Sequence, residues 1–574
     1  MKIKNIEKIL LNLILFLIIG FTFITSGNLF QREATIITLT LCILLYWSYS
    51  RSRFFDEINN YESILNKANY TFLFGAIFII NLLLQNAYVN FETIDWDISS
   101  YLVVSNEINQ GHLPLERQWE SKPPLLFYTY NFFTTLSGNN YLIFRILNDL
   151  IVYFLSIILF MISKKNFGNT KSVSLLISIT YIIFMSTVWN TLEYSELYSL
   201  IFLSVSFYFY TKKTSDNSTY LSGIFLGLSI LCNQGTLIFF LGFIFSLVFK
   251  NSDEVKNKLI FLTKFIFGIA IPNLIFLFLY SSNNLFDIYF AHFFSIPLSY
   301  ASEGFNFFGG LIDYLRSFYK FNAALYSLFI FIIISVLIQF LNNRIKNKKN
   351  ISYSIDDTSI FIIFSIIFYF VGSHGYYHHL LFLIFFLPLS IMKIATKAHK
   401  NLFILFLISA LISTSITQFP LSINNLKDLD TTYKNYPLRA LSEEIDSYFD
   451  DEDYTILAFD YNLVLFYLDK HNQSYIVHSE NYLEEYIVSE LIEISYMSEN
   501  EINELLDQEA DVIICSPRMI KNGVVTKNEL INCEISDYKK NYKKIDTSIF
   551  IKNENLQYYR DPYKEISLFI KQDE

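Results

Sequence analysis

Cysteine is scarce in this 574-residue sequence, which has only four, and no motif joins them. There is no Cys-x-x-Cys pair and no His/Cys spacing typical of a metal site, so a cysteine-based metal centre is not expected. The chain also lacks an internal repeat and a long low-complexity linker, which excludes a repeat architecture. Its C-terminal quarter has no glycine-rich phosphate loop, and we therefore do not expect nucleotide binding there.

Apolar residues, by contrast, are abundant: they make up 53% of the chain, and aromatic residues make up 18%. Apolar runs recur along the first three quarters, and most are long enough to cross the roughly 30 Å hydrocarbon core of a bilayer. This pattern predicts an α-helical polytopic membrane protein with about thirteen membrane-spanning helices. The thirteen runs cover residues 9–25, 34–49, 70–89, 141–162, 172–189, 196–211, 220–232, 236–249, 260–281, 323–341, 358–373, 379–392 and 401–418.

Basic residues give the predicted orientation. With thirteen spans, every basic cluster, from Lys2 and Lys4 to Lys397 and Lys400, falls on one side of the membrane. The positive-inside rule makes that side, and the N-terminus, cytoplasmic, and places the C-terminus outside. The first run lacks a clear cleavage site, so we expect a retained helix rather than a secretion signal. Many Ile, Asn and Lys beside few Gly and Pro are typical of an AT-rich bacterial genome, which favours a bacterial inner (plasma) membrane.

Charge separates the end of the chain from the rest. Residues 421–574 carry 31 Asp and Glu against 15 Lys and Arg, a net charge of about −16. We therefore expect a membrane domain over 1–420 and a small external α/β domain over 421–574. Helices are expected at Ala440–Phe449, Leu483–Ile494 and Glu501–Glu509, and strands at Tyr454–Phe459, Ser474–His478 and Asp511–Cys515. The negative charge argues against nucleic-acid binding, and Cys515 and Cys533 lie where a disulfide is permitted.

The external loop 90–140 lies between two apolar runs and gathers acidic residues around one lysine. These residues are Asp95, Asp97, Glu107, Glu120 and Lys122. A bilayer protein needs no such cluster for folding, and ionisable groups at this depth indicate function. We interpret the loop as a site for chemistry on a charged, lipid-linked substrate.

The loop resembles a motif of the GT-C glycosyltransferases, in the group of the dolichyl-phosphate-mannose-protein mannosyltransferases and ArnT-like aminoarabinose transferases. The matching positions are Asp97, Tyr101, Glu107, Gly111-His112-Leu113-Pro114 and Lys122-Pro123-Pro124. Further matches follow in order: Gly138 to Arg145, the acids Glu193 and Glu196, Gly227 to Gln234 with Asn233 in place of a Lys, and Tyr376 to Pro388 including His378 and His379. Ile98 follows Asp97 where the family commonly has Glu, and Ser121 separates Glu120 from Lys122. These departures leave the donor sugar open.

Asp97 is the predicted catalytic base. Sugar transfer from a polyprenyl phosphate requires removal of the acceptor proton, and a partly desolvated carboxylate gains basicity for that task. The alternative interpretation is a loop residue that caps a helix beginning near Ser99. Asp95, Asp97 and Glu120 are also candidate ligands for a divalent cation, because carboxylate oxygens at Asp-x-Asp spacing can hold one. Metal use stays open.

Lys122 is the predicted phosphate-binding cation. Two prolines follow it and prevent a helix from starting earlier, which fixes its position. A fixed ammonium suits the charge that develops on a phosphate leaving group, although a lysine snorkelling at the interface is the alternative. Arg117, Arg316 and the histidines His374, His378 and His379 are further phosphate candidates. The resemblance implies substrate-binding roles for Tyr101 and Glu107, whereas Arg145 and Asp149 favour a structural ion pair.

These observations predict an inverting membrane glycosyltransferase of GT-C type. Its donor would be a polyprenyl-phosphate-linked sugar, and its acceptor lipid A, a cell-surface glycan or a protein; membrane lipids surround the spans. The alternative is a polytopic transporter or lipid flippase, and a scaffold with an active outer domain is a third possibility. A transporter places its key polar residues at mid-bilayer, whereas a transferase places them at the outer boundary.

Overall fold

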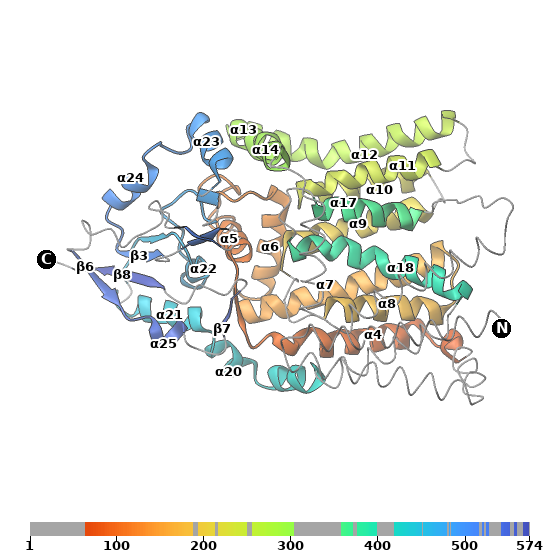
Figure 1. Cartoon of the computed structure of the whole chain (residues 1–574), viewed down its shortest axis with the longest axis horizontal. Helices are drawn as coiled ribbons and strands as arrows, with labels where there is room; N and C mark the ends of the chain where they lie inside the picture. The colour runs from red at the N-terminus through yellow and green to blue at the C-terminus, as the bar shows by residue number, and fades with distance from the viewer. Residues whose placement is uncertain are drawn as a thin grey trace.

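The fold was obtained as a computed structural model, and Figure 1 shows a bundle of long helices with the C-terminal elements gathered at one end. The structure describes residues 64–186, 193–212, 216–249, 255–302, 357–370, 376–398, 418–449, 452–478, 481–482, 484–515, 519–521, 524–526, 541–551, 556–558 and 566–572.

Nine of the predicted spans coincide with helices of the described part of the chain. These helices are α4 (Tyr70–Gln85), α7 (Tyr141–Met161), α8 (Lys171–Met185), α9 (Ser195–Lys212), α10 (Asp216–Ile230), α11 (Ile238–Phe249), α12 (Val255–Ser282), α17 (Asp357–Phe370) and α18 (Leu381–Ala398). The predicted spans 9–25, 34–49 and 323–341 lie outside the described residues, and so does 401–418 except for its last residue. The total of thirteen therefore stays a prediction.

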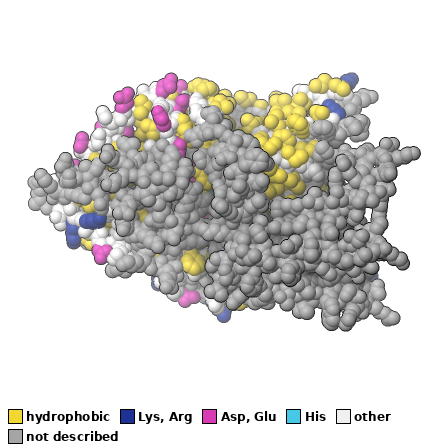
Figure 2. Space-filling model, viewed as in Figure 1, with side chains coloured by type: hydrophobic (Ala, Val, Ile, Leu, Met, Phe, Trp, Pro, Cys, Tyr) yellow, Lys and Arg dark blue, Asp and Glu magenta, His cyan; other side chains and the backbone are white. Residues whose placement is uncertain are grey.

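Among the described helices, three are long and apolar enough to cross a membrane by length and composition: Tyr70–Tyr88, Tyr141–Asn166 and Val255–Ser282. Shorter apolar helices occupy Lys171–Met185, Gln234–Val248, Asp357–Phe370 and His378–Ser390. Side chains of α12 such as Phe267, Leu274 and Phe278 are exposed. Figure 2 shows hydrophobic side chains gathered over the end of the molecule where α11 and α12 lie, and acidic side chains at the opposite end. Such an apolar surface is suited to contact with lipid.

Small residues let the helices around the site pack closely. A Cβ at Gly223 of α10 would lie 2.2 Å from the carbonyl oxygen of Phe265 in α12, and one at Gly268 would lie 2.6 Å from that of Tyr220. Glycine is therefore required at both contacts, in the manner of small-residue interfaces between membrane helices. Ser206 of α9 donates a hydrogen bond of 2.7 Å to the backbone oxygen of Ser222 in α10. The Ser206–Ser222 contact joins α10 to α9, which carries Glu196 in its first turn.

The loop 90–140, which the sequence predicts to be external, contains β1 (Glu92–Ile94), α5 (Trp96–Asn106) and α6 (Pro124–Leu136), after the short η1 (Asn86–Tyr88). The helix α6 begins at Pro124 with Pro123 in extended conformation, so the predicted effect of the two prolines on its start is confirmed. The helix α5 begins at Trp96, and its N-cap is Asp95, whose side chain accepts a hydrogen bond from the Ile98 amide at 3.2 Å. The alternative in which Asp97 caps a helix near Ser99 is therefore wrong.

Short elements connect the bundle helices. The stretch after α12 forms α13 (Phe286–Phe290), η4 (Ala291–Ser295) and α14 (Ile296–Ser302). The other connecting turns are η2 (Ile162–Asn166), η3 (Gln234–Leu237) and η5 (Tyr377–Leu380). The last of these leads directly into α18 and carries His378 and His379.

The C-terminal residues form a four-stranded sheet in the order β2-β3-β8-β6, with helices around it. β2 (Ile456–Ala458) runs parallel to β3 (Val512–Cys515), whereas β8 (Ser567–Lys571) is antiparallel to β3 and to β6 (Tyr542–Ile545). The helices are α20 (Leu429–Lys434), α21 (Pro437–Asp446), α22 (Leu463–Leu468), α23 (Glu485–Glu493), α24 (Glu501–Asp507) and α25 (Ser548–Ile551). β4 (Met519–Lys521) pairs with β5 (Val524–Thr526), and β7 (Leu556–Tyr558) pairs with β1.

The predicted helices of this region match α21, α23 and α24 to within a few residues, and two predicted strands match β2 and β3, so these predictions are confirmed. The third, Ser474–His478, is no named strand; its Ile476 instead forms a parallel bridge with Trp119 of the external loop. Cys515 is disulfide-bonded, and Cys533, with which the sequence permits a disulfide, lies outside the described residues.

Two buried charged groups attach the C-terminal elements to the bundle. The Glu92 carboxylate of β1 accepts hydrogen bonds of 2.6 Å from the Leu438 amide and from the Tyr467 hydroxyl. Arg145 of α7 pairs with Glu193 at 2.9 Å and donates to the backbone oxygen of Phe91. It also donates a hydrogen bond of 3.2 Å to the hydroxyl of Tyr436 in the C-terminal part. The structural role expected for Arg145 holds, but its ion-pair partner is Glu193, not Asp149, because Glu193 lies beside the guanidinium at the end of the bundle.

Candidate active site

The first turn of α5 brings Asp97 to a histidine from the C-terminal part of the chain. The Asp97 carboxylate lies 3.3 Å from Nε2 of His478. The imidazole also makes an edge-on contact with the Trp96 ring, at 5.9 Å between centroids. Trp96 is itself held by a hydrogen bond of 2.8 Å from its indole nitrogen to the buried Asp460. Asp97 therefore does not stand alone in a solvated loop but forms part of a packed polar cluster.

Backbone pairing between the external loop and residues 475–477 positions His478. The Trp119 amide donates to the Tyr475 oxygen at 2.7 Å, and the Val477 amide donates to the Trp119 oxygen at 3.1 Å. One residue on, the fully buried Glu120 accepts a hydrogen bond of 3.0 Å from Asn481. Two segments far apart in the sequence thus meet in register, and their register places His478 beside Asp97.

Lys122 is surrounded by carboxylates. Its charged form is disfavoured by burial, but the negative charges of Asp97, Glu196 and Glu120 outweigh that cost and raise the pKa of Lys122. Among the described residues the ammonium makes no ion pair or hydrogen bond. Lys122 is therefore a charged group that remains available for an anion.

The pKa values of Asp95 and Asp97 are shifted in opposite directions. Burial opposes the charged form of both, but for Asp97 the hydrogen bond from His478 and the charge of Lys122 outweigh it, so the pKa of Asp97 lies well below its ordinary range. The expected gain in basicity of Asp97 is therefore wrong for the protein without substrate. Burial, reinforced by the charge of Asp97, raises the pKa of Asp95 to about 7, although its carboxylate accepts a 2.7 Å hydrogen bond from Tyr194.

Tyr101 lies one helical turn beyond Asp97 on α5 and is completely buried. Its ring packs edge-on against Tyr130 at 5.5 Å and Phe127 at 6.4 Å between centroids. Its hydroxyl has no hydrogen-bond partner in the described part of the chain, and burial raises the pKa of Tyr101 well above its ordinary value. Tyr101 can therefore only act as a neutral hydrogen-bonding group.

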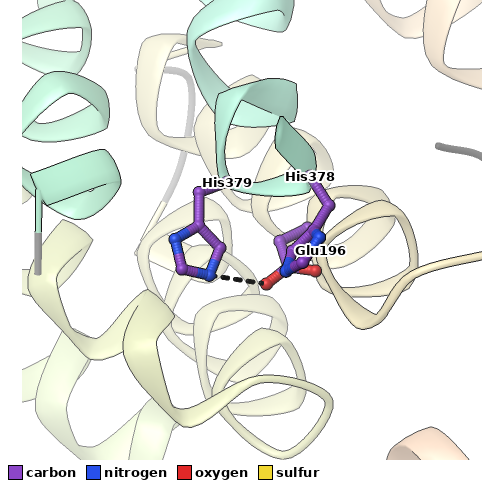
Figure 3. Close-up of side chains that lie close together, drawn as sticks. All are labelled: Glu196, His378 and His379. Atoms are coloured by element: carbon purple, nitrogen blue, oxygen red, sulfur yellow. Dashed lines mark ion pairs between the residues drawn. The ribbon is translucent and has the colours of Figure 1, made fainter. Parts of the chain in front are cut away.

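Glu196, His378 and His379 form a second cluster beside the first. Figure 3 shows the two imidazoles, from the turn before α18, next to the Glu196 carboxylate of α9. The Nε2 atom of His379 lies 3.6 Å from Glu196, and one ligand atom of each of the three residues lies within 4.8 Å of the others. The charge of His378 also helps lower the pKa of Asp97, and the His378 ring stacks on Tyr194 at 4.2 Å.

Among the described residues, this cluster is the group of His, Cys, Asp and Glu side chains with spacing suited to a metal ion. The candidate ligands Asp95, Asp97 and Glu120 do not belong to it. Asp95 is occupied by the α5 amide and Tyr194, Asp97 by His478, and Glu120 by Ser121 and Asn481. The described residues best placed to bind a metal ion are therefore Glu196, His378 and His379, at the beginning of α9 and just before α18. The loop residues predicted for this role are less suitable.

Other predicted site residues lie elsewhere. Glu107 follows the last residue of α5. Burial raises the pKa of its carboxyl group, and the positive charges of His112 and Arg117 partly oppose that shift. Arg117 is exposed, and the structure does not bring it to Asp97 or Lys122. Arg316 and His374 lie outside the described residues. The described structure thus gathers Asp97, Tyr101, Lys122, His378 and His379, but not Glu107 or Arg117.

The sequence prediction missed His478, Asp460 and Tyr194. His478 ends the segment predicted as a strand, which was its only local signal, and nothing in that pattern places it against Asp97. Tyr194 lies between Glu193 and Glu196, in the stretch already noted for its acids. Asp460 follows a buried strand, a position where polar residues often serve function, but the strand alone does not identify its partner Trp96.

Comparison with known proteins agrees with the predicted resemblance. Residues 121–276 match the family model described as dolichyl-phosphate-mannose-protein mannosyltransferase. The fold is similar to the crystal structure of ArnT from Cupriavidus metallidurans bound to undecaprenyl phosphate, with a TM-score of 0.52 and 11% identity, over 78% of this chain and 93% of that chain. The apo-state crystal structure of that ArnT aligns with a TM-score of 0.39 and 10% identity over the same shares. Curated proteins gave no sequence match.

The resemblance to the mannosyltransferase and ArnT-like group of GT-C glycosyltransferases is therefore confirmed. At 11% identity, the structural likeness establishes an ArnT-like helical fold. The matched family region begins at Ser121 and includes Lys122 and Glu196, so it covers part of both clusters.

Proposed function

We propose that this chain is an inverting glycosyltransferase that moves a sugar from a polyprenyl-phosphate-linked donor to an external acceptor. The observation that carries the proposal is a carboxylate, Asp97, whose pKa is lowered by the charge of a nearby ammonium, Lys122, that makes no ion pair with a described residue. A proton acceptor beside a phosphate-binding cation is the minimum that such a transfer requires. The likeness of the fold to an ArnT structure with bound undecaprenyl phosphate supports the choice of donor.

In the proposed reaction, an acceptor hydroxyl or amine attacks the anomeric carbon of the donor sugar. Its proton passes to Asp97 as the new bond to that carbon forms. The bond between the anomeric carbon and the phosphate oxygen breaks, and the electron pair leaves on the polyprenyl phosphate. Lys122 stabilises this leaving group, because a fixed charge is most effective where new negative charge develops.

The low pKa of Asp97 is compatible with a role as base once the donor is bound. It results in part from the charge of Lys122. A donor phosphate that engages the ammonium would weaken this effect and add negative charge nearby, and both changes raise the pKa of Asp97. The carboxylate would therefore become more basic when a proton has to be removed.

His478 extends the proposal to the C-terminal residues. We propose that 421–574 form an external α/β domain that completes the site and shapes the binding of an acceptor, which would be lipid A, a cell-surface glycan or a protein. The membrane part would span 1–420, with a cytoplasmic N-terminus, in a bacterial inner membrane. His478 would act as a positioning residue, because it contacts the Asp97 carboxylate.

No observation on the described residues favours a transporter or flippase. Glu196 lies in the first turn of α9, and His379 lies just before α18, so both belong to helix ends. These ends face the C-terminal elements in Figure 1. Polar groups at the end of the bundle are expected of a transferase.

The test is sugar transfer in proteoliposomes with a panel of labelled polyprenyl-phosphate sugars. Native protein should transfer label from at least one donor, and the isosteric Asp97→Asn variant should lose about two or more orders of magnitude in rate. The matched control is Asp453→Asn, an exposed carboxylate paired with Lys470 on the surface. Equal rates for native protein and Asp97→Asn would remove Asp97 from catalysis, and folded native protein without transfer would contradict the proposal.

A further inference from the structure

We propose that Glu196, His378 and His379 bind one divalent cation of the zinc class. Two imidazoles and one carboxylate form a ligand set that zinc and related ions favour, whereas magnesium and calcium prefer oxygen ligands. All three side chains are buried, and one ligand atom from each lies within 4.8 Å of the others. Three protein ligands leave a fourth position for another group, as in zinc sites that take part in chemistry.

The separation between His379 and Glu196 fits two ligands of one ion better than a hydrogen bond. Nε2 of His379 lies 3.6 Å from Oε1 of Glu196, which is too long for a hydrogen bond between nitrogen and oxygen. Two ligands held about 2.1 Å from a tetrahedral ion lie about 3.4 Å apart. The cluster is therefore close to ligand spacing.

The carboxylate of Glu196 is held in place by neighbours that carry no charge. Asn233 donates a hydrogen bond of 2.9 Å to its Oε1, and Ser195 donates one of 3.2 Å to its Oε2. Both neighbours fix the orientation of the carboxylate without neutralising it. Groups that orient a ligand in this way are a regular part of metal sites. The resembled family has a lysine at the position of Asn233. The ammonium of that lysine would repel a metal cation bound at Glu196, whereas the uncharged amide of Asn233 does not.

The excess of negative charge around the site also favours binding of a cation. Asp97, Glu120 and Glu196 surround the single ammonium of Lys122, which leaves negative charge in excess. With His378 neutral, as a metal ligand must be, three carboxylates face Lys122 and a protonated His478. An anionic donor increases this excess, and a divalent ion in the Glu196 cluster removes it. This last step rests on the proposed function, whereas the metal site itself does not.

The experiment measures metal binding without any sugar donor. The full chain is purified in detergent with an affinity tag free of histidine, stripped with a chelator, and titrated with Zn²⁺ against a chromophoric competitor. Co²⁺ provides a second probe, because its visible absorption reports the coordination geometry. Native protein should bind about one equivalent, with the spectrum of a four-coordinate nitrogen and oxygen site.

Three variants and one control make the assignment specific. Glu196→Gln and His379→Gln should weaken Zn²⁺ binding about a hundredfold or more, and Asn233→Ala about tenfold, since it removes only an orienting hydrogen bond. His471→Ala, an exposed histidine of the C-terminal part, should bind as native protein does. Monodisperse elution and unchanged helical circular dichroism identify the variants that are folded.

Native affinity retained in folded Glu196→Gln and His379→Gln overturns the site, and so does native protein that binds neither Zn²⁺ nor Co²⁺. Transfer is assayed separately on the stripped and reloaded protein. Metal binding without transfer from any donor contradicts the proposed function but leaves the metal site standing. Transfer that is equal in stripped and loaded protein overturns the role of the cation in balancing the donor charge.

Discussion

The two ends of α5 carry similar residues in very different surroundings. At its N-terminal end, Asp97 lies beside His478 and within the field of Lys122. At its C-terminal end, the described positive charges that act on Glu107 are those of His112 and the exposed Arg117. Both ends belong to one short sequence motif, yet among the described residues the Asp97 carboxylate contacts a histidine of the C-terminal part and the Glu107 carboxylate does not.

This difference separates a reacting end from a supporting end. Ten residues of α-helix span about 15 Å, so Asp97 and Glu107 cannot act on the same reacting atom. The motif therefore combines residues for chemistry with residues that hold the loop. Variants at the Asp97 end test this separation, and three of them are set against a matched change at the Glu107 end.

The largest effect is expected for the two acids themselves. Asp97→Asn should lower the transfer rate by about 10² to 10⁴, because the proton acceptor is lost while the shape is kept. Glu107→Gln, an equally conservative change, should stay within about threefold of native activity. The measurement is initial rate in proteoliposomes at saturating donor. Similar losses in the two variants would end the distinction between the two ends of α5.

The second-largest effect is expected when Lys122 is replaced, and Arg117 provides the matched comparison. Lys122→Met should lower kcat/KM for the donor about a hundredfold, because it removes the ammonium that stabilises the leaving phosphate in the proposed reaction. Arg117→Met, on the exposed side, should change it about twofold or less. Dependence of the rate on donor concentration gives these values. A larger loss of kcat/KM for Arg117→Met than for Lys122→Met would contradict this account, because it would place the donor phosphate at the Glu107 end of α5.

A smaller effect with a distinct signature is expected for His478→Gln. Its hydrogen bond lowers the pKa of Asp97, so its removal raises that pKa and moves the acidic limb of the pH profile of kcat/KM to higher pH. The rate at neutral pH should fall about tenfold, as for loss of one charge-assisted hydrogen bond. His112→Gln, near Glu107, should leave the profile in place. A His478→Gln profile that overlays that of native protein would leave His478 with a structural role only.

The smallest effect is expected for Tyr101→Phe. The hydroxyl is buried without a described partner, so its removal breaks no hydrogen bond to a described residue and should leave the thermal midpoint within a few degrees. If the hydroxyl binds the donor, KM should rise about fivefold to tenfold, the value of one neutral hydrogen bond. Unchanged KM together with raised stability would assign Tyr101 to packing alone.

Local rules account for what the sequence predicted correctly. Apolar runs located nine helices of the described bundle, and Pro123 and Pro124 fixed the start of α6, because both signals depend only on neighbouring residues. The position of Asp97 on the loop followed from the same reasoning. The sequence also predicted His378 and His379 as phosphate candidates, although the structure groups them with Glu196.

The remaining site residues depend on contacts that no local pattern contains. His478 reaches Asp97 because Trp119 pairs with the segment around Ile476, and this pairing joins distant parts of the chain. The low pKa of Asp97 follows from the same contact, so a correct expectation of burial gave the wrong net direction. The partner of Arg145 was missed for the same reason, since Glu193 is adjacent only in the folded bundle.

The most direct test is a cryo-EM structure of the full chain in nanodiscs with undecaprenyl phosphate. The account predicts that the phosphate lies against the Lys122 ammonium, at the Asp97 end of α5, with the isoprenoid chain leading into the membrane. A phosphate bound instead beside Arg117 and Glu107, with Lys122 out of contact, would contradict the assignment of the reacting end.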